Sequence, residues 1–301
     1  MDWFTRKIWL AVAIALVLGV ASYGAYDRSH STKHASGDAA AVIPSAEPSA
    51  SPTPTPHRST KPTSTASASS AASPTVRPTQ AAVAAGPVET AANGTPLPRV
   101  GTYQVAVKGN ENVKYGSFTV CDNSLPPTTT VAVSKATSKP GHSYNFDLAF
   151  YPGTQRHTER RIQRYFDDGS VTLTSESTTF TCANQTETST TSYAPPQLRV
   201  AAHLEKGKTW KVKGGDGTNT EEGTFTVTGT DTIKVGSKTY PVWVIKSNLK
   251  LTGATTGTRA QGWWWSPELA MPLKITEKAS ATQSNATYTA DVAITITGLP
   301  S

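Results

Sequence analysis

The sequence predicts an all-β protein with a large antiparallel curved sheet, of the half-barrel or sandwich type, preceded by one transmembrane helix and a disordered stalk. Three observations predict it: an uncharged apolar segment at residues 8–26, a Pro/Ser/Thr/Ala-rich stretch at 27–98, and short runs of alternating apolar and polar residues across 99–301. The chain therefore divides into a cytoplasmic tail at 1–7, a signal-anchor helix, a stalk and one extracytoplasmic domain.

The segment at residues 8–26 can cross a membrane. As a helix it would span roughly 28 Å, close to the ~30 Å hydrocarbon core of a bilayer. Aromatic rings at Trp9, Tyr23 and Tyr26 lie near its ends, where they prefer the two interfaces. The short tail ahead of it favours an N-inside orientation, because long domains translocate largely regardless of charge. We therefore expect a single-pass protein of the cell membrane with its C-terminal domain outside the cytoplasm.

A cleaved secretory signal is the alternative reading of the same segment. Arg6 and Lys7 would form its basic region, residues 8–20 its apolar region, and the small residues Ala21 and Ser22 a cleavage site. Both readings export the rest of the chain.

The stretch at 27–98 predicts a disordered stalk. From Ser29 to Pro98 it holds 11 of the 21 prolines of the whole chain and almost no large apolar side chain. Such a stretch cannot bury enough apolar surface to offset the entropy lost on ordering. A stalk of this kind would hold the following domain away from the membrane.

The alternating runs begin at Arg99. Tyr103, Val105 and Val107 alternate with polar or small residues, and the same period of two recurs to the end of the chain, which is typical of half-buried antiparallel strands. Glycine-rich turns separate the runs, and only 196–204 suggests a helical turn. A repeat of the domain at 99–200 and 204–300 is also predicted, because the spacing from Tyr103 to Phe118 equals that from Trp210 to Phe225.

A resemblance follows from particular motifs of this domain. Gly207-Lys208-Thr209-Trp210, Gly223-Thr224-Phe225-Thr226-Val227, Val242-Trp243-Val244-Ile245 and Trp264-Trp265-Ser266-Pro267-Glu268-Leu269 resemble uncharacterised envelope proteins of actinobacteria. More distantly, the domain is similar to half-barrel lipoprotein carriers of the LolA and LppX kind. The resemblance implies a curved sheet around an apolar cavity that holds lipid chains.

Cys121 and Cys182 are the two cysteines, and both lie in the exported part. An oxidising compartment permits a disulfide between them, and two separate buried thiols are the alternative.

Two groups of residues are candidates for ligand binding. In Trp263-Trp264-Trp265, the outer two indoles should face one side of a strand and Trp264 the other, so that they stack on a ligand or pack in the core. Arg160 and Arg164 share one strand face, where they form either an anion clamp or a solvated, charged face.

The sequence offers no motif for catalysis. His142, His157 and His203 are scattered, no nucleophile elbow or metal-ligand spacing is present, and Asp167-Asp168-Gly169 reads as a hairpin turn. We therefore expect no enzyme activity, no catalytic or metal-binding residue and no cofactor.

The formal net charge of +7 is an ordinary solubility charge, and no nucleic-acid-binding signature accompanies it. The main hypothesis is a non-catalytic domain that binds an apolar or amphiphilic envelope ligand, such as a lipid. A structural module that contacts a wall polymer or another protein is the alternative, and a hydrolase is the weakest reading.

Overall fold

The computed structural model describes residues 84–139, 141–151 and 156–300, which form one antiparallel sheet of 13 strands. The strands are β1 (Gly101–Tyr115), β2 (Phe118–Ser124), β3 (Thr128–Lys135), β4 (His142–Ala149), β5 (His157–Tyr165), β6 (Val171–Cys182), β7 (Gln185–Val200), β8 (Thr209–Gly215), β9 (Asn219–Val235), β10 (Lys238–Gly253), β11 (Thr256–Ser266), β12 (Met271–Gln283) and β13 (Ala286–Gly298). The predicted all-β class and large antiparallel sheet are confirmed.

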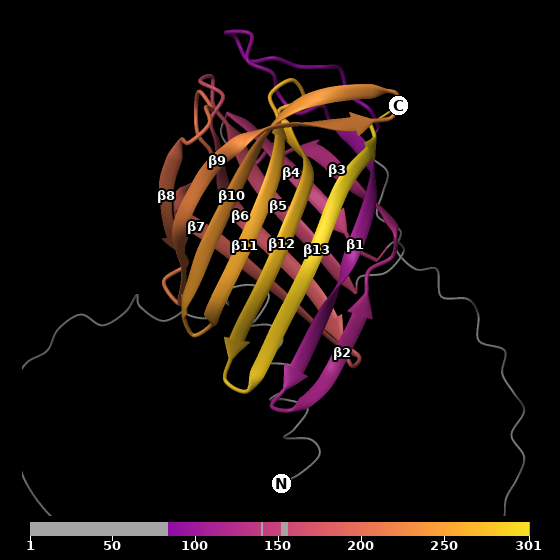
Figure 1. Ribbon diagram of the computed structural model, residues 1–301, viewed down its shortest axis with the longest axis vertical. Helices are drawn as coiled ribbons and strands as arrows, with labels where there is room; N and C mark the ends of the chain where they lie inside the picture. Colours follow the sequence, from indigo (N-terminus) through magenta and orange to yellow (C-terminus); the bar gives the residue numbers. More distant parts are fainter. Residues whose placement is uncertain (1–83, 140, 152–155, 301) are drawn as a thin grey trace, which may run out of the picture. The chain divides into compact units, whose positions relative to one another are not determined.

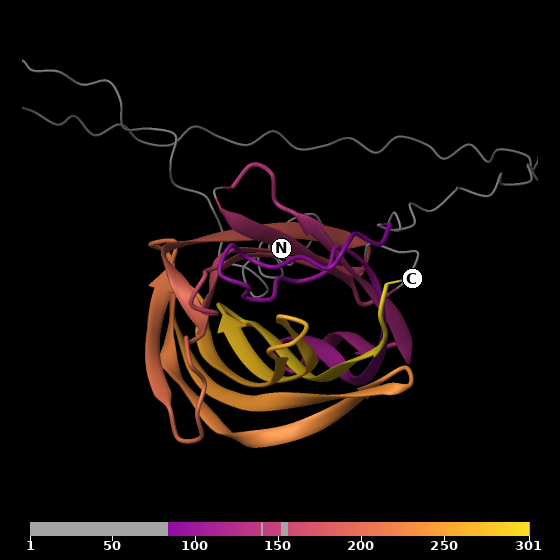
Figure 2. The same ribbon diagram turned by 90° about the horizontal axis from the view of Figure 1, so that it is seen from above.

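The sheet closes further than a half-barrel. Its strands run in the order β7-β6-β5-β4-β3-β1-β13-β12-β11-β10-β9-β8. Most strands pair with their neighbours in the chain, and β1 pairs with β13, which joins the first and the last strand of the described residues. Figures 1 and 2 show the resulting nearly closed barrel. The ring is interrupted between β7 and β8, which exchange no ladder hydrogen bonds.

Side chains bridge this seam between β7 and β8. The indole of Trp210 on β8 donates a hydrogen bond to the Leu198 carbonyl on β7 at 3.0 Å. Behind it, Arg199 on β7 forms an ion pair with Glu221 on β9 at 3.2 Å. The barrel is therefore closed on this side by side-chain contacts in place of a backbone ladder.

Strand β2 lies outside the ring. The first half of β1 pairs with β3 and the second half pairs with β2. The structure joins Cys121 on β2 to Cys182 at the end of β6, with the two Cα atoms 6.0 Å apart. This link ties the β1–β2 hairpin to the opposite wall.

Residues 84–98 belong to the folded domain, although the sequence assigned them to the stalk. They cross one end of the barrel in Figure 2, with Ala91 and Leu97 each only 4% exposed. The Thr95 hydroxyl donates to the Asp167 carbonyl in the β5–β6 turn at 2.6 Å. We call residues 84–98 the cover segment, and the end that they cross the mouth.

The β9–β10 hairpin is long and bends over the outside of its neighbours. At its tip, the Gly236 amide donates to the Thr297 carbonyl at the end of β13 at 3.0 Å. Figure 1 shows this hairpin reaching across the mouth end of β11 and β12. We call residues 229–243 the arm.

Two finer predictions were wrong. Tyr103 lies opposite Val131 and Phe118 opposite Tyr115, whereas Trp210 lies directly opposite Phe225, so the two similar sequence stretches do not form equivalent hairpins. The expected helical turn at 196–204 is the end of β7 and an irregular connection.

The expected tail at 1–7, the helix at 8–26 and the stalk up to residue 83 lie outside the described residues. Among the residues that the structure does describe, none forms a helix long and apolar enough to cross a bilayer.

Candidate functional site

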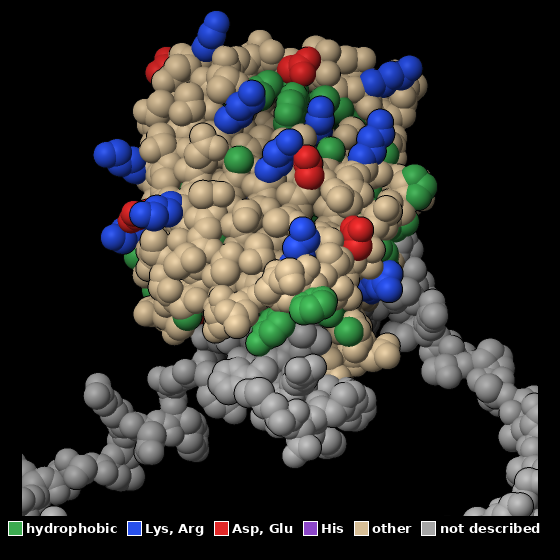
Figure 3. Space-filling view, turned by 60° about the horizontal axis from the view of Figure 1, so that its bottom comes forward, with side chains coloured by type: hydrophobic (Ala, Val, Ile, Leu, Met, Phe, Trp, Pro, Cys, Tyr) green, Lys and Arg blue, Asp and Glu red, His purple; other side chains and the backbone are tan. Residues whose placement is uncertain are grey.

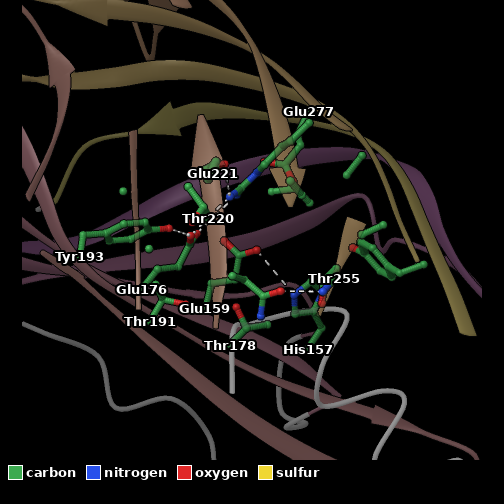
Figure 4. A pocket seen from close by; sticks show the side chains of 18 residues that line it. His157, Glu159, Glu176, Thr178, Thr191, Tyr193, Thr220, Glu221, Thr255 and Glu277 are labelled. Carbon is green, nitrogen blue, oxygen red and sulfur yellow. Dashed lines mark hydrogen bonds and ion pairs between the residues drawn. The ribbon is translucent and has the colours of Figure 1, made fainter. Parts of the chain in front are cut away.

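A belt of charged side chains crosses the inside of the barrel. Its members come from β1, β5, β6, β7, β9, β11 and β12, and none is more than 18% exposed. They are Glu111, His157, Glu159, Arg161, Glu176, Arg199, Glu221, Arg259 and Glu277. Figure 4 shows several of them around a shared space. We call this set the charged belt.

Two arginines of the belt, Arg161 and Arg259, each contact more than one of its carboxylates. Arg259 lies 3.0 Å from Glu277, 3.4 Å from Glu176 and 3.6 Å from Glu221. Arg161 contacts Glu159 at 2.6 Å and Glu176 at 2.8 Å. Burial raises the pKa of Glu176, but the neighbouring guanidinium groups outweigh burial and lower it below its usual range. Glu176 is therefore ionised throughout the neutral range.

His157 anchors the other side of the belt. Its Nδ1 lies 2.7 Å from Glu111 Oε2, and the Tyr151 hydroxyl donates to the other oxygen of Glu111 at 2.9 Å. Burial opposes protonation of His157, but its contacts with Glu111 and Glu159 outweigh burial and raise its pKa to about 9. The imidazole is thus a cation at neutral pH.

The belt surrounds a cavity of about 100 Å³ that is lined by His157, Glu159, Glu176 and Glu221 among others. A general base needs a pKa near the working pH and an unprotonated ring, and a general acid needs a raised carboxyl pKa. His157 is protonated, and Glu159 and Glu176 are held ionised by their cationic partners. The arrangement therefore suits a structural ion network better than acid–base chemistry.

The mouth holds a second pocket, of about 220 Å³, with a different character. Aromatic rings line it, from Tyr165 at the end of β5, Trp243 on β10 and Trp265 on β11. Thr95 of the cover segment and His203 of the β7–β8 connection add polar groups. We call this the mouth pocket.

The structure separates the three tryptophans that the sequence singled out. Trp263 and Trp265 point into the barrel and are 3% and 4% exposed. Trp263 packs edge-on against Phe225 with ring centroids 6.5 Å apart, and Trp265 stacks on Tyr165 at 6.4 Å. Of the three, Trp265 alone lines the mouth pocket.

Trp264 lies on the outside of β11 under the arm. Its indole donates to Asp231 of the arm at 3.0 Å, and the Lys274 ammonium lies 4.3 Å from its ring centroid. The ring covers Gly262, where a Cβ atom would come within 3.1 Å of it. Trp264 is half-buried, and its ring already has partners within the protein in Asp231 and Lys274.

The predicted arginine pair also faces outward. Arg160 pairs with Asp147 on β4, with Nη2 and Oδ2 3.1 Å apart, and Arg164 lies over the Phe166 ring at 4.9 Å. Arg161, between them in sequence, points inward into the charged belt. Arg160 and Arg164 thus have local partners on the sheet surface and line neither the belt cavity nor the mouth pocket.

Sequence reasoning missed the charged belt. The belt could have been found from charged residues at positions that the strand alternation assigns to the interior. Glu111 lies two residues before the buried Val113, and Glu159 and Arg161 lie on the same strand face as the buried Tyr165. No group of three or more His, Cys, Asp or Glu side chains in the described part of the chain is arranged to hold a metal ion.

The chain matches no protein-family model and no curated protein. Among solved structures, it is similar to the crystal structure of the hypothetical lipoprotein YmcC from Escherichia coli (K12), at 9% sequence identity over 65% of this chain and 88% of that chain. The TM-score is 0.31. A similarity at this level assigns no function, so the resemblance to actinobacterial envelope proteins and to lipoprotein carriers stays a prediction.

Proposed function

We propose that this chain is a membrane-anchored, extracytoplasmic and non-catalytic binding protein that holds the apolar part of an amphiphilic envelope ligand in the mouth pocket. The observation that carries this proposal is the aromatic lining of that pocket by Tyr165, Trp243 and Trp265. The residues at 8–26 supply the anchor and the stretch after them supplies the spacer.

The volume of the mouth pocket limits the size of the ligand group that it can hold. Sites for drug-sized ligands typically have about 300–1,000 Å³. At about 220 Å³, the mouth pocket suits one ring or a short apolar branch of a larger molecule. Thr95 and His203 at the pocket would receive the polar part that follows.

The interior of the barrel is less suited to a lipid chain. A cavity beside Trp263 and Leu273 has only about 50 Å³, and the belt cavity is lined by carboxyl groups that pair with arginines. Moving an acyl chain past buried charges would strip them of their partners at high cost. The proposal therefore places the ligand at the mouth, in contrast to the carriers that enclose lipid in a concave sheet.

The belt supports a non-catalytic role. A hydrolase of this fold would need a free histidine or a protonated carboxyl beside a substrate cavity. Here His157 is held in its charged form by Glu111 and Glu159, and the pKa values of Glu159 and Glu176 are lowered by their cationic partners.

Native mass spectrometry of the full chain, extracted from its host membrane in a mild detergent, tests the proposal. We expect a co-purified adduct on the wild-type chain that is lost from Leu204→Trp, which fills the mouth pocket with a larger ring. Phe118→Trp at the 76%-exposed tip of the β1–β2 hairpin is the matched control and should keep the adduct. A bare mass for the wild-type chain, or an adduct on all three chains, would contradict the proposal.

A further inference from the structure

The outer face of β8–β11 carries a hollow of about 1,040 Å³, separate from the mouth pocket and the belt. Two cross-strand rows of outward side chains form it. One row is Lys213, Glu222, Lys250 and Thr258, and the other is Lys211, Thr224, Asn248 and Ala260. We call these eight residues the outer hollow.

The floor of the outer hollow is backbone. Gly223 lies between the two rows, and a Cβ atom there would come within 2.1 Å of the Asn248 carbonyl oxygen. Because Gly223 alternates with the outward residues Glu222 and Thr224, its missing side chain belongs to the interior, and only backbone lies between the two rows at this point of the outer face.

In the described part of the chain, two of the four charged side chains of the outer hollow form no ion pair. Lys213 lies 3.4 Å from Glu222, whereas Lys211 and Lys250 are exposed and form no ion pair with any carboxylate in the part of the chain that the structure describes. The hollow thus has three ammonium groups against one carboxylate. Figure 3 shows that lysine and arginine side chains also outnumber carboxylates over the wall of the barrel that it displays.

We propose that the outer hollow binds an anionic, polyhydroxylated polymer, such as a phosphodiester-linked polyol of the cell wall. Lys211 and Lys250 would each contact a phosphate as a compact charge. Thr224 and Asn248, together with Thr258 beside Lys250, supply hydroxyl and amide groups for the polyol hydroxyls. The volume of the hollow suits several units of a chain.

The chemistry of the outer hollow separates this partner from other polyanions. Single-stranded nucleic acid is bound by stacking its bases on aromatic rings, and none of the described residues that line the outer hollow is aromatic. A bilayer surface is flat and would meet the rims of a hollow before its floor. A flexible polyanion can follow the floor between the lysines.

Binding of poly(glycerol phosphate) to the full chain in neutral phosphatidylcholine nanodiscs tests this inference. The double variant Lys211→Gln/Lys250→Gln should raise the Kd at least about tenfold, because two charge-assisted contacts are lost. Lys108→Gln/Lys114→Gln on β1 removes the same charge from two exposed lysines elsewhere and should leave the Kd within about twofold of the wild-type value. Neutral dextran should not bind.

Three results would overturn the inference: equal loss in the two double variants, tighter binding of poly(dT) than of poly(glycerol phosphate), or stronger binding to phosphatidylglycerol vesicles than to the polymer. The inference shares only the extracytoplasmic location with the proposed function. The double variant at the outer hollow should keep the adduct of the mouth pocket, so the two proposals can fail separately.

Discussion

Arg199 on β7 and Glu221 on β9 form a buried ion pair at 3.2 Å, beside the seam where β7 and β8 exchange no ladder hydrogen bonds. Their side chains are only 2% and 7% exposed, so neither group has water as an alternative partner. The closure of this barrel therefore depends on a side-chain contact at the place where backbone pairing stops.

The buried ion pair at the seam predicts that a single substitution, Glu221→Gln, lowers the free energy of unfolding substantially. Glu221→Gln leaves the Arg199 charge buried without its carboxylate, and breaking a buried pair in this way typically costs about 3–5 kcal/mol. Urea unfolding should report this loss, and hydrogen exchange should speed up in β7 and β8 before other strands. Lys278→Gln, which breaks the exposed pair with Asp291, should cost about 0–1 kcal/mol. Equal losses for the two variants would show that the seam pair does not hold the barrel closed.

The Cys121–Cys182 link predicts a redox-dependent stability. The two residues are 61 apart in sequence, and closing a loop of that length stabilises a fold by about 4 kcal/mol in the chain-entropy model. The double variant Cys121→Ser/Cys182→Ser should unfold at correspondingly lower urea concentration, and the wild-type chain should lose the same amount in reductant. Alkylation of two thiols in the native, unreduced protein would refute the link.

His157 predicts a decline of stability at alkaline pH. Its folded pKa of about 9 lies above the value of about 6.5 expected in the unfolded chain. The proton on His157 therefore stabilises the fold fully below pH ~6.5, and this contribution, about 3 kcal/mol, is lost as the pH rises through ~9.

Unfolding free energies measured from pH 6 to 10 check this prediction. His157→Gln should be less stable than the wild-type chain at pH 6 and should lose the decline between pH 6.5 and 9. His142→Gln, at an exposed position, should keep it. A wild-type stability that does not change over this range would contradict the charge state assigned to His157.

Gly262 predicts how closely Trp264 fits beneath the arm. A Cβ atom at this position would lie 2.7 Å from Thr276 Oγ1 and 3.1 Å from the Trp264 ring. Gly262→Ala should therefore displace the indole and cost about 1–3 kcal/mol of overpacking. Adding Thr276→Ala removes the closest atom and should restore part of the loss. If Gly262→Ala is as stable as the wild-type chain, the arm does not hold Trp264 in place.

The sequence predicted the strands because apolar alternation survives wherever one face is buried. Tyr103, Val105 and Val107 are each at most 2% exposed, and the alternation placed them correctly. It failed for β7, because QTETSTTS carries few apolar residues and its inward positions are filled by Ser189 and Thr191. Short polar side chains can face the interior of a barrel without leaving an apolar pattern.

Closure of the barrel could not be read from the sequence. It depends on β1 pairing with β13, a long-range contact that no local pattern encodes, and on inward charges that a hydrophobic pattern treats as exposed. The tryptophan triplet was assigned the right alternation, yet its neighbours Asp231 and Lys274 come from the arm and from β12. Those contacts decide that Trp264 packs against the protein's own side chains.

Photocrosslinking in nanodiscs tests the central claim, that the mouth and not the interior receives the apolar part of the ligand. The probe is a fatty acid with a diazirine at its terminal carbon, and peptide mass spectrometry locates the labelled residues of the full chain. We predict labelling at 201–204 or at Trp243, reduced at least about tenfold in Leu204→Trp. Labelling at inward residues that line the belt cavity, such as Thr178 or Tyr288, or labelling confined to residues 1–26, would contradict the account.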